Sequence, residues 1–389
     1  MLLRPVSFLD IAVFLFFLLF YLLRDLNIVK IVRCGLSALP FLIIKLPLQL
    51  LKERCFTSKE LQMRYTRRTT VFQDVAVRCI RWAFTNIPSD VGRVFLSKGI
   101  AVPYLKFRML RSGFIPGRSC PTWVEINERD FKGLWISYSP DARPDIVIYY
   151  IHGGGLAMGS SHFYLEFLLT WVSVLKSSGF HNPAIFTLEY TLVPDESYPF
   201  QLHETLAGYN HVLSRIEDPR SVVVSGDSAG ALLVLSMLLY LGTKARSEKP
   251  LFAALISPWT HLVSHKNINT ASDFLDSEVL NAYGLQYAGS EDPSDPLISP
   301  GDCEDTALWA ESMPRQGVGF YYGSEEVFVP GIKGLSKRLA GVGRVLSRQD
   351  EAVHAWPIAA MFLETEEAAR RKGLLEISAD IVEAVRRER

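Results

Sequence analysis

The 389-residue chain has few cysteines, no net charge and no Asn-x-Ser/Thr sequon. Its five cysteines are scattered, odd in number and form no CxxC pair, so neither a zinc site nor a disulfide framework is expected. Forty-one basic residues balance 41 acidic ones, and this neutrality gives no support for a nucleic-acid partner, which would need a basic face. Internal repeats and low-complexity segments are also lacking. With 49% hydrophobic residues, the chain can instead form two average domains or one large α/β domain with additions.

The N-terminus is richer in apolar residues than the rest of the chain. Residues 6–23 contain one charge, Asp10, and an unbroken apolar run from Ile11 to Leu23. Because about 20 apolar residues span a bilayer, this segment is long enough to be a marginal membrane anchor. No small-residue cleavage site follows it, which favours an uncleaved anchor over a secretory signal or a buried helix.

A second apolar stretch, residues 28–51, carries three basic residues and two prolines, which favours a segment lying at the membrane interface. We therefore divide the chain into an anchor and interfacial segment, residues 1–52, and a main body, residues 53–389. Basic residues outnumber acidic ones just after the first stretch, and the positive-inside tendency then favours a cytosolic body. The lack of sequons agrees with that side but leaves it open.

The body alternates strand-like and helix-like runs. Strands are predicted at 146–151, 184–190, 221–225, 252–256 and 318–322, and helices at 162–177, 201–216, 229–243 and 333–341. Alternation of this kind predicts a mostly parallel sheet with helices on both faces. Residues 53–115 are mixed and predicted helical, whereas 261–312 resemble a long irregular insertion. In such a sheet, ligands bind beyond the carboxyl ends of the strands.

The pentapeptide GDSAG follows one predicted strand and precedes a helix. Its glycines, Gly226 and Gly230, permit the sharp turn that exposes a serine hydroxyl, with Asp227 and Ala229 on either side of the serine. The alternative is turn punctuation, and the strand–turn–helix context favours Ser228 as a nucleophile.

The tetrapeptide HGGG, His152 to Gly155, follows another predicted strand. Consecutive glycines leave backbone N–H groups uncovered, and such groups can bind the negative oxygen of a tetrahedral intermediate. A phosphate-binding loop is the alternative, but it usually offers a Lys followed by Ser or Thr, and residues 156–160 contain no lysine.

A serine nucleophile needs a base and a carboxylate that orients the base. His354, in EAVHAW, follows a late strand-like run, and His261 and His265 in the irregular segment are its competitors. The carboxylate is Glu325 or Glu326 in YGSEEVF, which composition alone does not separate. The order serine, acid, histidine is the one expected of α/β-hydrolases.

With these segments in view, residues 145–360 resemble the hormone-sensitive-lipase-like branch of the α/β-hydrolases, and most of all the fungal membrane-anchored steryl acetyl hydrolases. HGGG and GDSAG together are far more specific than either motif alone. Residues 190–200, YTLVPDESYPF, also resemble the family's Y-x-L-x-P segment. The resemblance implies an α/β-hydrolase domain over residues 53–389, with a helical cap from parts of 53–115 and 261–312.

The resemblance also assigns roles to individual residues. It makes Ser228 the nucleophile and His354 the base. The family's acid lies in a D-P-L-x-D pattern, whose best match, EVFVP, selects Glu326 over Glu325 although Glu replaces the usual Asp. Backbone N–H groups of Gly154, Gly155 and Ala229 would form the oxyanion hole, with Gly153 as a weaker candidate.

The combined prediction is a membrane-anchored serine esterase that acts on a hydrophobic ester, such as an acetylated sterol or another lipid, without a metal or organic cofactor. The resemblance places it at the endoplasmic reticulum membrane. Two alternatives are an arylformamidase-like amide hydrolase and a non-catalytic ligand-binding member of the fold. Acyl length, alcohol and oligomeric state are not fixed by the sequence.

Overall fold

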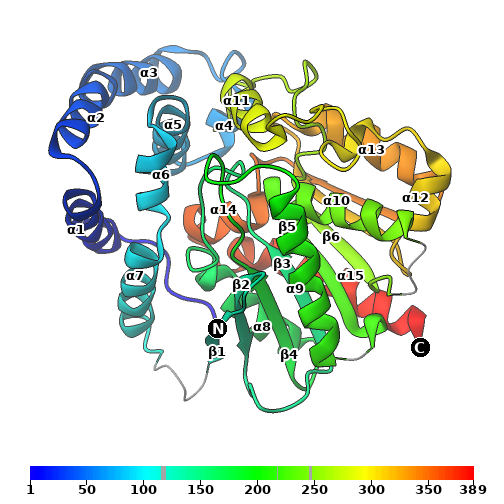
Figure 1. Cartoon of the computed structure of the whole chain (residues 1–389). Coiled ribbons are helices and arrows are strands. Elements are labelled where there is room, and N and C mark those ends of the chain that lie inside the picture. The colour runs from blue at the N-terminus through cyan, green and yellow to red at the C-terminus, as the bar shows by residue number, and fades with distance from the viewer. Residues whose placement is uncertain (115–119, 217, 245–247) are drawn as a thin grey trace.

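The computed structural model describes residues 1–114, 120–216, 218–244 and 248–389. In this part of the chain, eight strands form one sheet in the order β1-β2-β4-β3-β5-β6-β7-β8 (Figure 1). They are β1 (Thr122–Asn127), β2 (Lys132–Ser137), β3 (Ile146–Ile151), β4 (Pro183–Leu188), β5 (Val222–Asp227), β6 (Phe252–Ile256), β7 (Val318–Gly323) and β8 (Val345–Asp350). Strands β3 to β8 pair in parallel, whereas β2 pairs antiparallel with β1 and β4.

The sheet is buried on both faces. Successive side chains of β3 alternate between two apolar clusters, with Tyr149 in one and Tyr150 in the other. Helices α9 (Phe200–Ile216), α10 (Ala229–Thr243) and α13 (Val329–Ala340) cover one face, and α8 (Leu165–Ser177) and α15 (Glu367–Glu388) cover the other. This burial on both sides explains why the central strands are nearly continuous apolar runs.

The predicted central strands and helices are confirmed, with ends shifted by a few residues. Strands β1 and β2 and helix α15 were not predicted. The segment 261–312 is not wholly irregular, since it contains α11 (Ser277–Ala288) and α12 (Thr306–Ser312). The Asp residues that suggested a loop there are helix caps: Asp276 accepts hydrogen bonds at the start of α11, and Asp305 does so at the start of α12.

Helix α1 (Phe8–Asp25) contains most of the predicted anchor, yet its first turn is tied to the body. The Asp10 side chain is fully buried and lies 2.7 Å from Arg111 and 3.4 Å from Arg108. Arg108 also donates two hydrogen bonds to Glu166 of α8, at 2.7 and 2.8 Å. The one acid inside the predicted anchor is therefore an ion-pair partner of the body.

The segment predicted to lie at the interface is one continuous helical run. It comprises α2 (Ile28–Pro40), the π-helical turn η1 (Phe41–Lys45), α3 (Leu46–Leu51) and a second π-helical turn, η2 (Lys52–Phe56). Among the described residues, this run, Ile28–Phe56, is the helix that is long and apolar enough to cross a membrane by length and composition. By this criterion the membrane candidate is the run that was predicted to lie at the interface, whereas α1, which contains Asp10, Arg24 and Asp25, does not meet it.

Four helices lie between these N-terminal helices and the sheet (Figure 1). They are α4 (Arg64–Arg68), α5 (Val71–Asn86), α6 (Ser89–Phe95) and α7 (Lys98–Arg111). The helical prediction for residues 53–115 is thereby met over residues 64–111, and residue 115 lies outside the described residues. We call α1 together with residues 28–56 the N-terminal arc, because Figure 1 shows them curving around the outside of α5 to α7.

Candidate active site

Ser228 occupies the turn between β5 and α10. Its backbone has φ 51° and ψ −117°, a left-handed conformation that is strained for any residue other than glycine. Its N–H donates to the Ile256 carbonyl of β6 at 2.9 Å, and its own carbonyl accepts from Trp259 at 3.1 Å. Strain held in place by flanking hydrogen bonds is the geometry of a nucleophile elbow.

The glycines on either side of Ser228 are required by close packing. A Cβ on Gly226 would lie 2.7 Å from the Ile151 carbonyl oxygen at the end of β3, and a Cβ on Gly230 would collide with the same oxygen. The G-x-S-x-G spacing therefore reflects the contact of the serine turn with the neighbouring strand.

A cavity of about 400 Å³, here called the serine cavity, is lined by Ser228 and His354 together. Gly154, Gly155 and Asp227 also line it, and the remaining walls are largely apolar. Apolar side chains come from both predicted cap segments, with Ile80, Phe84 and Leu96 from the first and Phe274, Leu275 and Leu280 from the second. Helix α14 (Trp356–Leu363) supplies Ile358 and Phe362.

His354 and Glu326 meet although they come from different loops. His354 follows β8 and Glu326 follows β7, and the His354 Nδ1 lies 3.2 Å from Glu326 Oε2. The rings of Phe274 and Phe328 lie edge-on to the imidazole, with centroids 5.8 and 5.3 Å away. Both polar side chains are buried, so the surrounding apolar groups strengthen their interaction.

The competing residues lie elsewhere. Glu325 forms an ion pair with Arg68 of α4 instead of facing His354. His261 bonds to the Thr260 hydroxyl at 2.8 Å, His265 is exposed, and neither histidine lines the serine cavity.

The HGGG loop places backbone donors beside Ser228. Gly154 and Gly155 have φ of 116° and 64°, which glycine adopts without penalty. Within the described part of the chain, the N–H groups of Gly154, Gly155 and Ala229 have no hydrogen-bond acceptor. Gly153 is not positioned for an oxyanion role, because its N–H donates to Asp227 Oδ1 at 2.9 Å.

Asp227 holds the HGGG loop in place through hydrogen bonds. Its carboxylate accepts hydrogen bonds from the hydroxyls of Tyr150 at 2.6 Å and Tyr164 at 2.8 Å, besides the bond from Gly153. The ring of His152 stacks on Tyr190 with centroids 4.4 Å apart. Asp227 and His152 therefore hold the glycine loop against the serine turn, which gives both motif residues a structural role.

Burial shifts both members of the histidine–glutamate pair toward their neutral forms. It raises the pKa of Glu326 to about 8 and lowers the pKa of His354. Proton transfer to the imidazole would create a cation 3.2 Å from the carboxyl oxygen, and that cation favours the carboxylate. The His354–Glu326 pair is therefore suited to a reaction in which the imidazole gains a proton beside an ionised carboxylate.

A second buried carboxylate, Asp273, joins the two loops and was not predicted. Its Oδ1 accepts from the His354 N–H at 3.2 Å, and its Oδ2 accepts from the Val327 N–H at 2.9 Å. Burial raises the pKa of Asp273 to about 6. The residue lies in a segment without a motif, so its only sequence signal was an acid among loop-forming residues.

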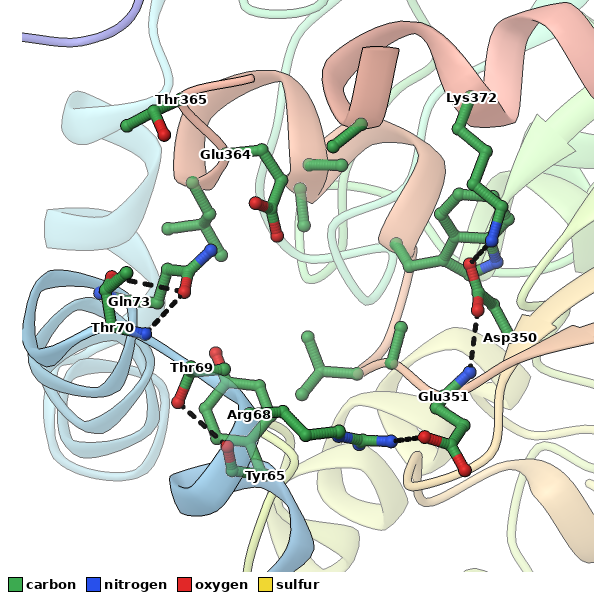
Figure 2. A pocket seen from close by; sticks show the side chains of 17 residues that line it. Tyr65, Arg68, Thr69, Thr70, Gln73, Asp350, Glu351, Glu364, Thr365 and Lys372 are labelled. Atoms are coloured by element: carbon green, nitrogen blue, oxygen red, sulfur yellow. Dashed lines mark hydrogen bonds and ion pairs between the residues drawn. The ribbon is translucent and has the colours of Figure 1, made fainter. Parts of the chain in front are cut away.

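A different cavity of about 390 Å³, drawn in Figure 2, also borders α14. Its rim is polar: Arg68 pairs with Glu351, and Lys372 lies 2.5 Å from Asp350. Ser228, Glu326 and His354 do not line it. We call it the polar cavity.

Among the described residues, no group of three or more His, Cys, Asp or Glu side chains is arranged to hold a metal ion. The polar groups that line the serine cavity are the hydroxyls of Ser228 and Tyr164, the His354 imidazole, the Asp227 carboxyl group and backbone amides. Such groups suit proton transfer and the binding of a negatively charged oxygen.

Solved structures define the fold class. The hormone-sensitive-lipase homologue EstE7 from a metagenome library matches 82% of this chain and 99% of its own, with TM-score 0.63 and 19% identity. A structure of EstE5 matches 82% of this chain and 100% of its own, with TM-score 0.65 and 20% identity. The protein therefore has the α/β-hydrolase fold of these esterase structures.

The family follows from the sequence comparisons. A family model described as steryl acetyl hydrolase matches residues 126–361, more than half of the chain. The chain therefore belongs to the steryl acetyl hydrolase family, which confirms the predicted resemblance.

Individual relatives agree with this placement. One relative is the steryl acetyl hydrolase mug81 of Schizosaccharomyces pombe, as that protein is named. It is 30% identical over 199 residues, which cover 48% of this chain and 52% of mug81. Steryl acetyl hydrolase 1 of Saccharomyces cerevisiae is 27% identical over 215 residues, 51% and 49% of the two chains. An acetyl-hydrolase of Streptomyces hygroscopicus is 29% identical over 225 residues, 56% and 70%. The chain spans about half the length of the two yeast relatives.

Proposed function

We propose that the protein is a membrane-associated serine hydrolase of carboxylic esters, with a hydrophobic ester such as an acetylated sterol as substrate. The observation that carries the proposal is the serine cavity, where a strained Ser228 and a His354 paired with Glu326 line one apolar space. Its walls suit a hydrophobic substrate, and the family description names steryl acetates.

In the proposed reaction, Ser228 Oγ attacks the ester carbonyl carbon while His354 Nε2 accepts its proton. Glu326 accepts a hydrogen bond from His354 Nδ1–H and stabilises the imidazolium. The N–H groups of Gly154, Gly155 and Ala229 donate to the developing oxyanion. His354 then protonates the leaving alcohol, which leaves an acyl-serine.

Water completes the cycle. His354 takes a proton from the water, the resulting hydroxide attacks the acyl-serine carbonyl, and Ser228 leaves as the free alcohol when His354 returns the proton. The products are a carboxylic acid and an alcohol, and the described residues supply every proton transfer.

The direct test replaces the nucleophile. Ser228→Ala should lower kcat/KM for p-nitrophenyl acetate and for a steryl acetate by about four orders of magnitude or more. A fluorophosphonate probe should label the parent protein at Ser228 and leave the variant unlabelled, with Ser225→Ala as a control for serine loss in the same strand. Retained hydrolysis in Ser228→Ala, or an unlabelled parent, would contradict the proposal. A formyl amide added to the panel separates an amide hydrolase from an ester hydrolase.

We also propose that the N-terminal arc holds the protein at a membrane, with the endoplasmic reticulum as its location. Many of its large apolar side chains are exposed, including Phe16, Leu19 and Phe20 of α1. The full chain should float with phosphatidylcholine vesicles, and replacing these three residues by Ser should weaken flotation. Equal flotation of both proteins would contradict membrane contact through this face.

A further inference from the structure

A second apolar cavity lies between the N-terminal arc and the serine cavity. It has a volume of about 580 Å³ and we call it the outer cavity. Its walls include Phe14 and Leu15 of α1, Phe41 and Leu42 of η1, and Trp82 and Ala83 of α5. The rings of Phe41 and Trp82 stack with centroids 5.4 Å apart, which closes one wall with aromatic surface.

The outer cavity and the serine cavity share a partition. Ile80 and Phe84 of α5, Leu96 after α6, and Met158 after the glycine loop line both cavities. All four of these shared side chains are apolar. Met158 is unbranched and adapts its rotamers readily, so it is the most adaptable side chain of the partition.

The same helices form both the wall of the outer cavity and the exposed surface of the arc. Leu15 and Leu42 line the cavity and are also 53% and 46% exposed, respectively. Apolar side chains therefore line the outer cavity and the partition and make up most of the walls of the serine cavity. The polar cavity, in contrast, is bordered by Arg68, Asp350, Glu351 and Lys372.

We propose that the outer cavity receives the bulky apolar alcohol part of the ester, and that substrate arrives there from lipid between the helices of the arc. The inference rests on the proposed esterase function and adds the placement of the two halves of the substrate. The acyl group and the scissile carbonyl lie in the serine cavity, beside Ser228. The alcohol part extends past Phe84 and Met158 into the outer cavity.

This placement makes the membrane-facing helices part of the substrate site. A serine cavity of about 400 Å³ accepts a small ester by itself, whereas a rigid polycyclic alcohol needs the additional 580 Å³. Residues that line only the outer cavity should therefore control selectivity for large alcohols and leave small esters unaffected.

Ala83 provides the test, because it lines the outer cavity and not the serine cavity. Ala83→Trp fills the outer cavity with an aromatic ring. Thr85→Trp adds the same ring to an exposed position of α5 that lines neither cavity, and serves as the matched control. The full-length parent and both variants are assayed on p-nitrophenyl acetate, p-nitrophenyl palmitate and a steryl acetate in phosphatidylcholine vesicles.

Ala83→Trp should lower kcat/KM for the steryl acetate by about tenfold or more, while p-nitrophenyl acetate changes by less than about twofold. Thr85→Trp should leave both rates near the parent values. If Ala83→Trp loses its melting transition, Ala83→Leu replaces it and should show a smaller loss in the same direction.

The outcomes separate the inference from the proposed function. A parent that hydrolyses no ester, or whose hydrolysis survives Ser228→Ala, overturns the proposed function. With an active parent, an unchanged or equally reduced rate on both acetates in Ala83→Trp overturns the inference. A loss confined to the palmitate ester overturns it too, because it places the acyl chain in the outer cavity.

Discussion

The serine cavity and the polar cavity have almost the same volume, about 400 and 390 Å³, yet they differ in chemistry. Both touch α14, where Ala359 and Leu363 line the two of them. The serine cavity encloses a few buried polar groups within apolar walls. The polar cavity is rimmed by charged side chains, of which Arg68 pairs with Glu351 and Lys372 with Asp350, and Glu364 lines it as well (Figure 2).

Volume alone therefore does not identify the reactive site. Ion pairs near solvent are screened and contribute about 1 kcal/mol or less, whereas the same groups in an apolar enclosure interact far more strongly. Equivalent substitutions on the two sides of the His354 loop should consequently have very unequal effects.

Removing the base should have the largest effect. His354→Ala should lower kcat/KM for p-nitrophenyl acetate by about 10⁴-fold or more, because Ser228 would then lose its proton acceptor. His265→Ala, at an exposed position outside both cavities, is the matched control and should be near parent activity. If His354→Ala lowered kcat/KM by less than about tenfold, the assignment of the serine cavity as the reactive site would be contradicted.

The two adjacent glutamates give a matched pair. Glu326→Gln should lower kcat by about 10³- to 10⁴-fold, because a neutral amide no longer stabilises the imidazolium. Glu325→Gln, which affects only the ion pair with Arg68 on the polar side, should change kcat by less than about threefold. Comparable losses in both variants would contradict the assignment of Glu326.

The pH profile sharpens the same assignment. The carboxylate is the active form, and burial raises the pKa of Glu326 to about 8, so kcat/KM should rise with pH up to that region. Burial lowers the pKa of His354, so the rise of kcat/KM that reports loss of its proton should lie below pH 6.5, the usual pKa of histidine being about 6.5. Glu326→Gln should therefore remove the limb near pH 8 and retain the lower one. An unchanged limb in that variant would assign it to another group.

Asp273 should have an intermediate effect, because it positions both loops without touching substrate. Asp273→Asn preserves shape but presents an N–H toward one of the two backbone donors, His354 N–H or Val327 N–H. A displaced imidazole should lower kcat by about 10- to 100-fold with KM nearly constant. The control is Asp276→Asn, since Asn also caps helices well. An equal fall in both variants, or a change confined to melting temperature, would reduce Asp273 to a purely structural residue.

The sequence predicted the parts of the molecule in which local pattern and tertiary role coincide. Val222 to Val224 form a buried parallel strand, and an apolar run is what a strand covered on both faces requires. Gly226 and Gly230 mark a close contact that any side chain would break. These local requirements can therefore be recognised in the sequence.

Other features depend on contacts between distant segments and leave little local trace. Glu325 and Glu326 are alike in composition, and only the loop conformation after β7 turns the second toward His354. Asp273 is 81 residues from His354 in the chain. The long apolar helix at residues 28–56 contains basic residues and prolines, which favour a segment lying at the membrane interface over a second membrane span. Its exposed face is clear only once the body behind it is in place.

The smallest effect should come from Arg68, which lies at the edge of the polar cavity and pairs there with Glu351 (Figure 2). Arg68 also pairs with Glu325. Both partners are neighbours of proposed catalytic residues, so proximity alone would suggest a large loss. However, the Arg68 side chain is 31% exposed and Glu351 is 70% exposed, and exposed ion pairs of this kind contribute about 1 kcal/mol or less. Glu325 is 14% exposed, so its pair with Arg68 accounts for most of the expected loss. Arg68→Ala should therefore lower kcat/KM by less than about fivefold. It should reduce the free energy of unfolding in urea by about 1 kcal/mol or less, and Arg68→Lys should lie closer to the parent in both measurements. A loss as large as that of Asp273→Asn would show that the charged rim positions the His354 loop, and the two cavities would then act as one site.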